Sequence, residues 1–125
     1  TTNPLLSRKS IQLAILNFKK ALKSDDADSL FSVNKLQERF YNSKAEPLNH
    51  DPNNLTRTQD LDPWFQENSN LYLFTKKSFL STNARIGSKP MFIETPRFES
   101  TDIDTPDDWE LAEVMIEYYK KKGLL

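Results

Sequence analysis

The sequence predicts an α/β layer fold. Apolar residues recur at helical spacing near both ends of the chain, and short runs of β-prone residues lie between them. The expected order is helix, strand, a long polar segment, strand, helix, strand and helix, which is typical of an α/β architecture. With 125 residues, the chain is long enough for one small domain.

The first helix is predicted to begin after Ser7, because serine is a good N-cap residue. Lysines gather near its expected C-terminal end, where the helix dipole favours cations. A short strand buried on both faces is expected at residues 29–33, where Leu30 and Phe31 are adjacent. The apolar stripe of the helix consists of Ile11, Ala14, Ile15, Phe18, Ala21 and Leu22.

The middle of the chain differs in composition from the rest. Residues 34–65 are polar, rich in Asn and Pro, and carry scattered aromatic side chains. A structureless loop of that length is uncommon inside a compact domain, so we expect a projecting arm with hairpin strands near residues 37–41 and 54–58. Its aromatic residues need a cover, and a second copy of the chain is the simplest one. A homodimer is therefore expected.

After the arm, strands are expected at residues 71–74 and 91–94, with a short helix at residues 76–80 between them. Gly87 and Pro90 mark a turn before the last strand. The chain is accordingly divided into three parts. These are a core helix and strand (residues 1–33), the arm (residues 34–70), and the remaining core with the C-terminal helix (residues 71–125).

The last helix has the clearest start signal in the sequence. Thr105 is a good N-cap, Pro106 fits the first helical position, and Asp108 completes a capping box. Lysines and then Gly123 follow, as is typical of a helix C-terminus. The expected buried stripe consists of Leu111, Ala112, Met115, Tyr118 and Tyr119.

Composition excludes several classes of function. The chain has 17 basic and 18 acidic residues with interspersed signs, whereas a nucleic-acid binder would show a basic excess or stripe. Cysteine is absent, which rules out disulfides and thiolate metal sites. No apolar run approaches the roughly 18 residues that span a bilayer. We therefore expect a cytoplasmic protein that binds neither nucleic acid nor membrane.

Two carboxylates precede the last helix. If residues 101–104 end a strand, Asp102 and Asp104 lie on one face, roughly 6–7 Å apart, with Ile103 pointing into the core. A divalent cation would relieve their repulsion, and Mg²⁺ uses one or two carboxylates together with substrate phosphates. The alternative is that Asp102 is a solvated strand end and Asp104 an auxiliary helix cap. Elementary physics favours neither of these two interpretations.

Four segments, in chain order, resemble the N-acylneuraminate cytidylyltransferases, also called CMP-sialic acid synthetases. The last of them has the Asp-Ile-Asp-Thr motif, and the second has Arg-x-Gln-Asp-Leu. Together the four cover nearly the whole chain. They are TTNPLLSRKSI, LTRTQDLDPWFQENSNLYLFTKKSFL, NARIGSKPMFIETP and STDIDTPDDWELAE.

The resemblance implies a fold and a reaction. The fold would be the C-terminal part of a Rossmann-like nucleotidyltransferase sheet with a projecting dimerisation arm. The anomeric hydroxyl of a nonulosonic acid would attack the α-phosphorus of CTP, giving a CMP-sugar and pyrophosphate, with Mg²⁺ or Mn²⁺ as the cofactor. The family's Gly-rich CTP-binding segment has no counterpart here, so the isolated chain is expected to be inactive. A non-catalytic dimerisation or sugar-binding module is the alternative.

The resemblance also implies roles for individual residues. Asp102 and Asp104 match the family's metal-binding pair. Residues matching positions at the acidic sugar are Arg57, Gln59, Asn3, Tyr72 and Asn68.

Some of these matches have plainer explanations. Without the resemblance, Arg57 would be interpreted as a surface arginine, Tyr72 as a packing residue and Asn3 as a turn residue before Pro4. Ser69 replaces the glycine of the family's Glu-Asn-Gly run, and serine adopts a positive φ less readily than glycine does.

Overall fold

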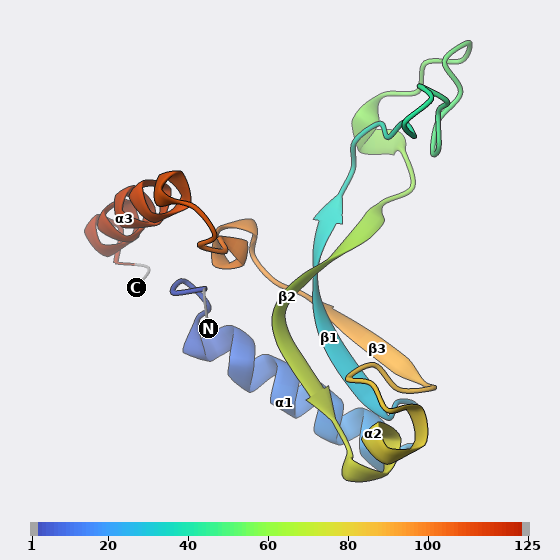
Figure 1. The fold of residues 1–125 in the computed structure, drawn as a ribbon, viewed down its shortest axis with the longest axis vertical. Coiled ribbons are helices and arrows are strands. Elements are labelled where there is room, and N and C mark those ends of the chain that lie inside the picture. The colour runs from blue at the N-terminus through green and yellow to red at the C-terminus, as the bar shows by residue number, and fades with distance from the viewer. Residues whose placement is uncertain (1–2, 124–125) are drawn as a thin grey trace. The chain divides into compact units, whose positions relative to one another are not determined.

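The computed structural model describes residues 3–123 and has a mixed α/β fold (Figure 1). Three helices and a three-stranded sheet lie within this part of the chain. Residues 3–34 and 67–123 form one compact unit, and residues 35–66 form another. The predicted α/β class is confirmed at this level, while a Rossmann-like topology stays a prediction.

The sheet has the strand order β2-β1-β3, with β1 (Ser29–Leu36) in the centre. Strand β3 (Pro90–Glu94) is parallel to β1, with Ser29 opposite Pro90 and Val33 opposite Glu94. Figure 1 shows β2 (Trp64–Phe74) running in the opposite direction to β1. All three predicted strands are present, although β1 ends later and β2 begins earlier than expected.

Helix α1 (Arg8–Lys23) packs on the sheet through a small apolar core. The Ser7 hydroxyl accepts a hydrogen bond from the Ser10 N–H at 3.1 Å, which confirms the predicted N-cap. The core joins helix and sheet and consists of Ala14, Phe18, Leu30 and Ile93, with Leu71, Leu73 and Met91 packed against it.

The short helix α2 (Lys76–Thr82) lies between β2 and β3, as predicted. The Thr75 hydroxyl caps it by accepting from the Ser78 N–H at 3.0 Å. The helix ends at Asn83, which adopts the left-handed conformation common at helix C-termini.

The unit of residues 35–66 does not contain the predicted hairpin. Between the end of β1 and the start of β2, its regular structure is an isolated bridge between Tyr41 and Pro47 and one turn of 3-10 helix, Thr58–Asp60. Asparagine side chains form hydrogen bonds with backbone groups that would pair with each other in a strand ladder. The side chain of Asn49 accepts from the Phe40 N–H at 2.9 Å and donates to the Glu38 carbonyl at 2.7 Å. The two predicted strands of the arm are therefore wrong.

Helix α3 (Pro106–Lys121) begins where it was predicted to begin. The Thr105 hydroxyl accepts from the Asp108 N–H, and the Asp108 carboxylate accepts from the Thr105 N–H, so the capping box is formed. The predicted buried stripe is only partly right. Ala112 is buried, but Leu111 is 53% and Tyr118 55% exposed.

Candidate functional site

A cluster of polar side chains lies where two parallel strands end. Asn34 is near the carboxyl end of β1, and Thr95 directly follows β3. The Thr95 N–H donates to the Val33 carbonyl at 3.1 Å, which continues the pairing of these strands. Since β1 and β3 are parallel, their carboxyl ends meet at one edge of the sheet. In open α/β sheets this edge is where ligands bind.

Asn68, on β2, is the centre of the cluster. Its Nδ2 donates to Asn34 Oδ1 at 3.0 Å, to Thr95 Oγ1 at 2.8 Å and to Ser100 Oγ at 3.1 Å. Its Oδ1 accepts from Ser32 Oγ at 2.6 Å. Ser32 and Thr95 are 1% and 3% exposed, so water does not replace these partners readily. The Asn68 side chain is thus held in a single orientation.

A second half of the network joins the N-terminal segment to β2. Asn3 Nδ2 donates to Asn70 Oδ1 and to the Glu99 carbonyl. The buried Glu99 carboxylate accepts from the Ser7 N–H at 3.1 Å, at the start of α1, where the helix dipole favours negative charge. The Asn70 N–H donates to Asn68 Oδ1 at 3.3 Å and connects the two halves. The structure therefore brings Asn3 and Asn68 into one network.

Most members of this network were not predicted from the sequence. The one available signal was the spacing of Asn68 and Asn70, since residues two apart on a strand share a face. Nothing in the sequence distinguishes the others from ordinary turn or surface residues. The members that were missed are Ser32, Asn34, Asn70, Thr95, Glu99 and Ser100.

Tyr72 lies on β2, and its hydroxyl is hydrogen-bonded to Ser69 at 3.1 Å and to the Glu67 carboxylate. The Arg85 guanidinium lies 4.1 Å from the centre of its ring. Burial, together with the hydrogen bond to Glu67, raises the pKa of the Tyr72 hydroxyl above its usual value. Near neutral pH the hydroxyl is therefore protonated and can donate a hydrogen bond.

Ser69 adopts a left-handed backbone conformation, with φ of 57°. Ser69 is thus a non-glycine residue in a conformation that glycine adopts more readily. A left-handed conformation costs a residue with a side chain about 1–2 kcal/mol, and glycine avoids this cost.

We therefore expect Ser69→Gly to raise the free energy of unfolding by about 0–1 kcal/mol, because the relieved strain exceeds the greater entropy of glycine and the loss of the exposed hydrogen bond to Tyr72. Urea denaturation monitored by circular dichroism measures the change. Ser43→Gly is a matched control, because Ser43 is also exposed and its φ is not positive. Equal effects at the two positions would contradict strain at Ser69.

The predicted Asp-x-Asp pair does not end a strand. After β3 the chain passes Pro96, which has no N–H for a sheet ladder, and forms a 3-10 helix, Arg97–Ser100. Asp102 and Asp104 lie in the irregular segment between this helix and α3. The strand-end geometry that we expected for the pair is therefore wrong.

Both carboxylates of the pair are nevertheless exposed. Asp102 Oδ1 accepts from the neighbouring Ile103 N–H at 3.1 Å, and within residues 3–123 neither Asp102 nor Asp104 forms an ion pair. The Asp108 carboxylate is committed to Thr105, whose hydrogen bonds lower its pKa.

The described residues contain no group of three or more His, Cys, Asp or Glu side chains that could hold a metal. Two exposed carboxylates fit Mg²⁺, which uses one or two carboxylates and completes its shell with waters and phosphates.

Arg57 and Gln59 lie in the other unit, residues 35–66. Arg57 Nε is 2.8 Å from Asp60 Oδ2, and the pair is largely exposed. Such a surface ion pair contributes about 0–1 kcal/mol, so the guanidinium can exchange this partner for another carboxylate. The Gln59 backbone carbonyl accepts a hydrogen bond from Gln37 Nε2 at 3.0 Å. The Gln59 side chain takes no part in this contact.

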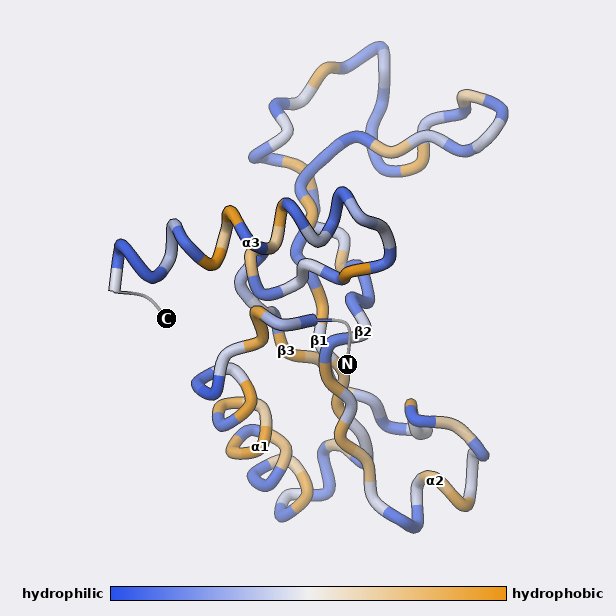
Figure 2. Tube along the Cα trace, turned by 60° about the vertical axis from the view of Figure 1, so that its left-hand side comes forward, coloured by the Kyte–Doolittle hydropathy of each residue, from blue (hydrophilic) through white to orange (hydrophobic). Residues whose placement is uncertain are grey.

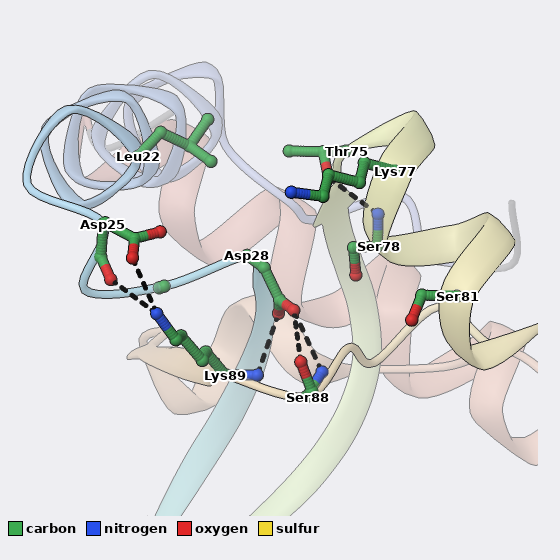
Figure 3. A pocket seen from close by; sticks show the side chains of 10 residues that line it. Leu22, Asp25, Asp28, Thr75, Lys77, Ser78, Ser81, Ser88 and Lys89 are labelled. Atoms are coloured by element: carbon green, nitrogen blue, oxygen red, sulfur yellow. Dashed lines mark hydrogen bonds and ion pairs between the residues drawn. The ribbon is translucent and has the colours of Figure 1, made fainter.

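A pocket of about 350 Å³ lies at the amino ends of β1 and β3 (Figure 3). Asp28 accepts hydrogen bonds there from the Ser88 hydroxyl and N–H and from the Lys89 N–H, at 3.0–3.1 Å. Burial raises the pKa of the Asp28 carboxyl, but these hydrogen bonds outweigh it and lower the pKa overall. Lys89 Nζ is 2.8 Å from Asp25 Oδ2. Asp25 and Lys89 therefore pair with each other, and Asp28 fixes the turn before β3.

These features define an α/β protein with a network of polar side chains at the carboxyl ends of its two parallel strands. No protein-family model matches the sequence. The chain is similar to N-acylneuraminate cytidylyltransferase A of Danio rerio, with 29% identity over 119 residues. The match covers 90% of this chain and 26% of the relative, so the chain spans about a quarter of the relative's length. This distant similarity suggests a relation to the cytidylyltransferases.

Within residues 3–123, none of the helices has both the length and the apolar character that crossing a membrane requires.

Proposed function

We propose that this chain is part of a cytidylyltransferase that activates a nonulosonic acid with CTP to give a CMP-sugar and pyrophosphate. The observation that carries the proposal is the similarity to a cytidylyltransferase along 90% of the chain. The polar network at the carboxyl ends of β1 and β3 supports it, because Asn3 and Asn68, which match sugar-site positions of the family, lie at the edge where α/β enzymes bind ligands.

We assign the sugar-facing roles according to how each side chain is bonded. The Tyr72 hydroxyl donates to Glu67 and would exchange that partner for the sugar. Arg57 would leave Asp60 and pair with the sugar carboxylate, for which its planar fork is suited. Asn68 has both polar atoms committed to protein groups, so it would position Asn70 and Ser100 rather than bind the sugar directly. Both polar atoms of the Asn3 side chain are also bonded to protein groups, so Asn3 would position its neighbours, and Gln59 would contribute a polar contact.

Asp102 and Asp104 would hold the metal ion. When bound, Mg²⁺ supplies neutralisation of the triphosphate charge, which is the main requirement of phosphoryl and nucleotidyl transfer. Asp108 would not take part directly, because Thr105 occupies its carboxylate. Asp108 would instead hold the start of α3 in place, and with it the segment that carries Asp102 and Asp104.

A titration of the 125-residue chain with Mn²⁺ tests the assignment of the metal pair. Paramagnetic broadening of amide signals is expected to be selective for residues 102–105. Asp102→Asn and Asp104→Asn are each expected to weaken Mn²⁺ binding at least tenfold, about 1.4 kcal/mol, because each removes one of two anionic ligands.

Asp62→Asn is the matched control, since Asp62 is also exposed and lies in the other unit. It should leave Mn²⁺ binding unchanged. Broadening spread evenly over the surface acids, or affinities unaffected by Asp102→Asn, would reject the metal site. The alternative assignment, a non-catalytic dimerisation or sugar-binding module, would then be preferred.

A further inference from the structure

Helix α3 carries an apolar stripe that its own fold does not cover. Its inner face is made by Ala112, which is buried, and by Tyr119, whose ring stacks on Phe98 at a centroid distance of 4.2 Å. Figure 2 shows further hydrophobic positions along α3. Four large hydrophobic side chains of α3 are exposed within the described chain, namely Trp109 (56%), Leu111 (53%), Val114 (65%) and Tyr118 (55%), and the last three form the stripe.

The stripe continues into charged residues at both ends. Asp107 lies in the first turn of α3 and Lys121 in the last. Asp107, Leu111, Val114, Tyr118 and Lys121 follow one another at steps of four, three, four and three residues, which keeps all five on one face of the helix. This is the spacing of a coiled-coil seam, with an acid at one end, a base at the other and apolar residues between.

Such a seam is complementary to itself when two helices run antiparallel. With the two-fold axis close to Val114, Leu111 of one copy packs near Tyr118 of the other, and Asp107 lies opposite Lys121. A parallel pair would instead place Asp107 against Asp107 and Lys121 against Lys121, which is repulsive. The helix dipoles also favour the antiparallel arrangement.

We propose that α3 docks antiparallel onto α3 of a second copy of this chain. The contact is limited to one helix of 16 residues, roughly 24 Å long. An interface of this size belongs to the weak and transient class rather than to obligate dimers. The surface differs from the aromatic residues of the 35–66 unit and does not depend on the proposed function.

The absence of cysteine from the sequence allows a direct test by disulfide trapping. Val114→Cys should form intermolecular disulfides under mild oxidation at least tenfold faster than Lys120→Cys, an exposed control position on the same helix but outside the stripe. Equal rates for the two variants would overturn the proposal.

The direction of the helices is tested by mixing two single-cysteine variants, Asp107→Cys and Lys121→Cys. Antiparallel docking predicts that mixed disulfides form in clear excess over the two like pairs. Like pairs in excess would show a parallel arrangement and reject the proposal.

Charge reversal gives an independent measurement on the chain without cysteines. Asp107→Lys and Lys121→Asp should each weaken self-association in sedimentation experiments, and the double variant should restore it. Circular dichroism checks that α3 remains helical in each variant. A dimer that is equally stable in all three variants and in Val114→Glu would use another surface and contradict the proposal.

Discussion

Replacing Asn68 with alanine is expected to lower the free energy of unfolding by about 2–4 kcal/mol, because it removes four hydrogen bonds from a largely buried polar network. The Asn68 side chain bonds to Ser32, Asn34, Thr95 and Ser100. Ser32 keeps its hydrogen bond with Leu71 and Thr95 its contact with Ser100, but both side chains are almost fully buried, so water cannot readily replace the bonds to Asn68. A loss of this size is a large fraction of the stability of a typical small domain.

Chemical denaturation measures this loss, and Asn53→Ala is the control. Asn53 is exposed, and among the described residues its side chain makes no hydrogen bond, so its replacement should change stability by less than about 0.5 kcal/mol. Similar effects at Asn53 and Asn68 would show that the network contributes little to the fold. A stable Asn68→Ala variant would also remove the reason for assigning Asn68 a positioning role.

Gly87→Ala is expected to destabilise the protein by about 2–3 kcal/mol through overpacking. A Cβ atom at Gly87 would lie 2.2 Å from both Asp28 Oδ1 and Ser78 Oγ, far inside contact distance. Ser78 is buried and cannot move away freely, and Asp28 is held by the turn that follows Gly87. The substitution must therefore displace Asp28 or the turn before β3.

The other glycine of the chain provides the comparison. Gly123 has φ of 65°, and a Cβ atom added there would meet no described atom within 4 Å. Gly123→Ala therefore carries backbone strain of about 1 kcal/mol without a clash. Thermal unfolding should show a clearly larger loss for Gly87→Ala than for Gly123→Ala. The reverse order would mean that the residues around Gly87 relax at little cost.

Local signals predicted the helices well. Ser7 caps α1, and the Thr105 and Asp108 box starts α3, because capping depends only on residues a few positions apart. The three strands of the sheet were also predicted, since their apolar runs are bounded by polar breaks. The boundaries of β1 and β2 were missed because tertiary pairing extends both strands into polar sequence.

Features that depend on distant partners were not predictable in this way. The Asn49 side chain bonds to the backbone of Glu38 and Phe40, so the strand expected at residues 37–41 does not form a ladder. Leu111 and Tyr118 have helical spacing typical of a core, but the buried face of α3 is rotated away from them. Periodicity identifies an apolar stripe and does not say which neighbour covers it.

In the candidate site, too, local sequence signals were visible and contacts between distant residues were not. Asp102 and Asp104 stood out because of their expected place at a strand end and their match to a metal-binding pair, but their strand setting was wrong. The network around Asn68 was largely invisible, because Glu99 and Ser100 come from a segment about 30 residues away and meet Asn70 only in the fold.

The position of the 35–66 unit in the chain has a consequence for how such proteins diversify. The unit leaves the sheet from β1 and returns through β2, and these two strands are hydrogen-bonded neighbours. Its two ends are thus attached to neighbouring strands. The 35–66 unit can therefore be lengthened, shortened or exchanged with only a small change in the entropy of loop closure. The core is left free to keep its packing while this insertion acquires new surfaces.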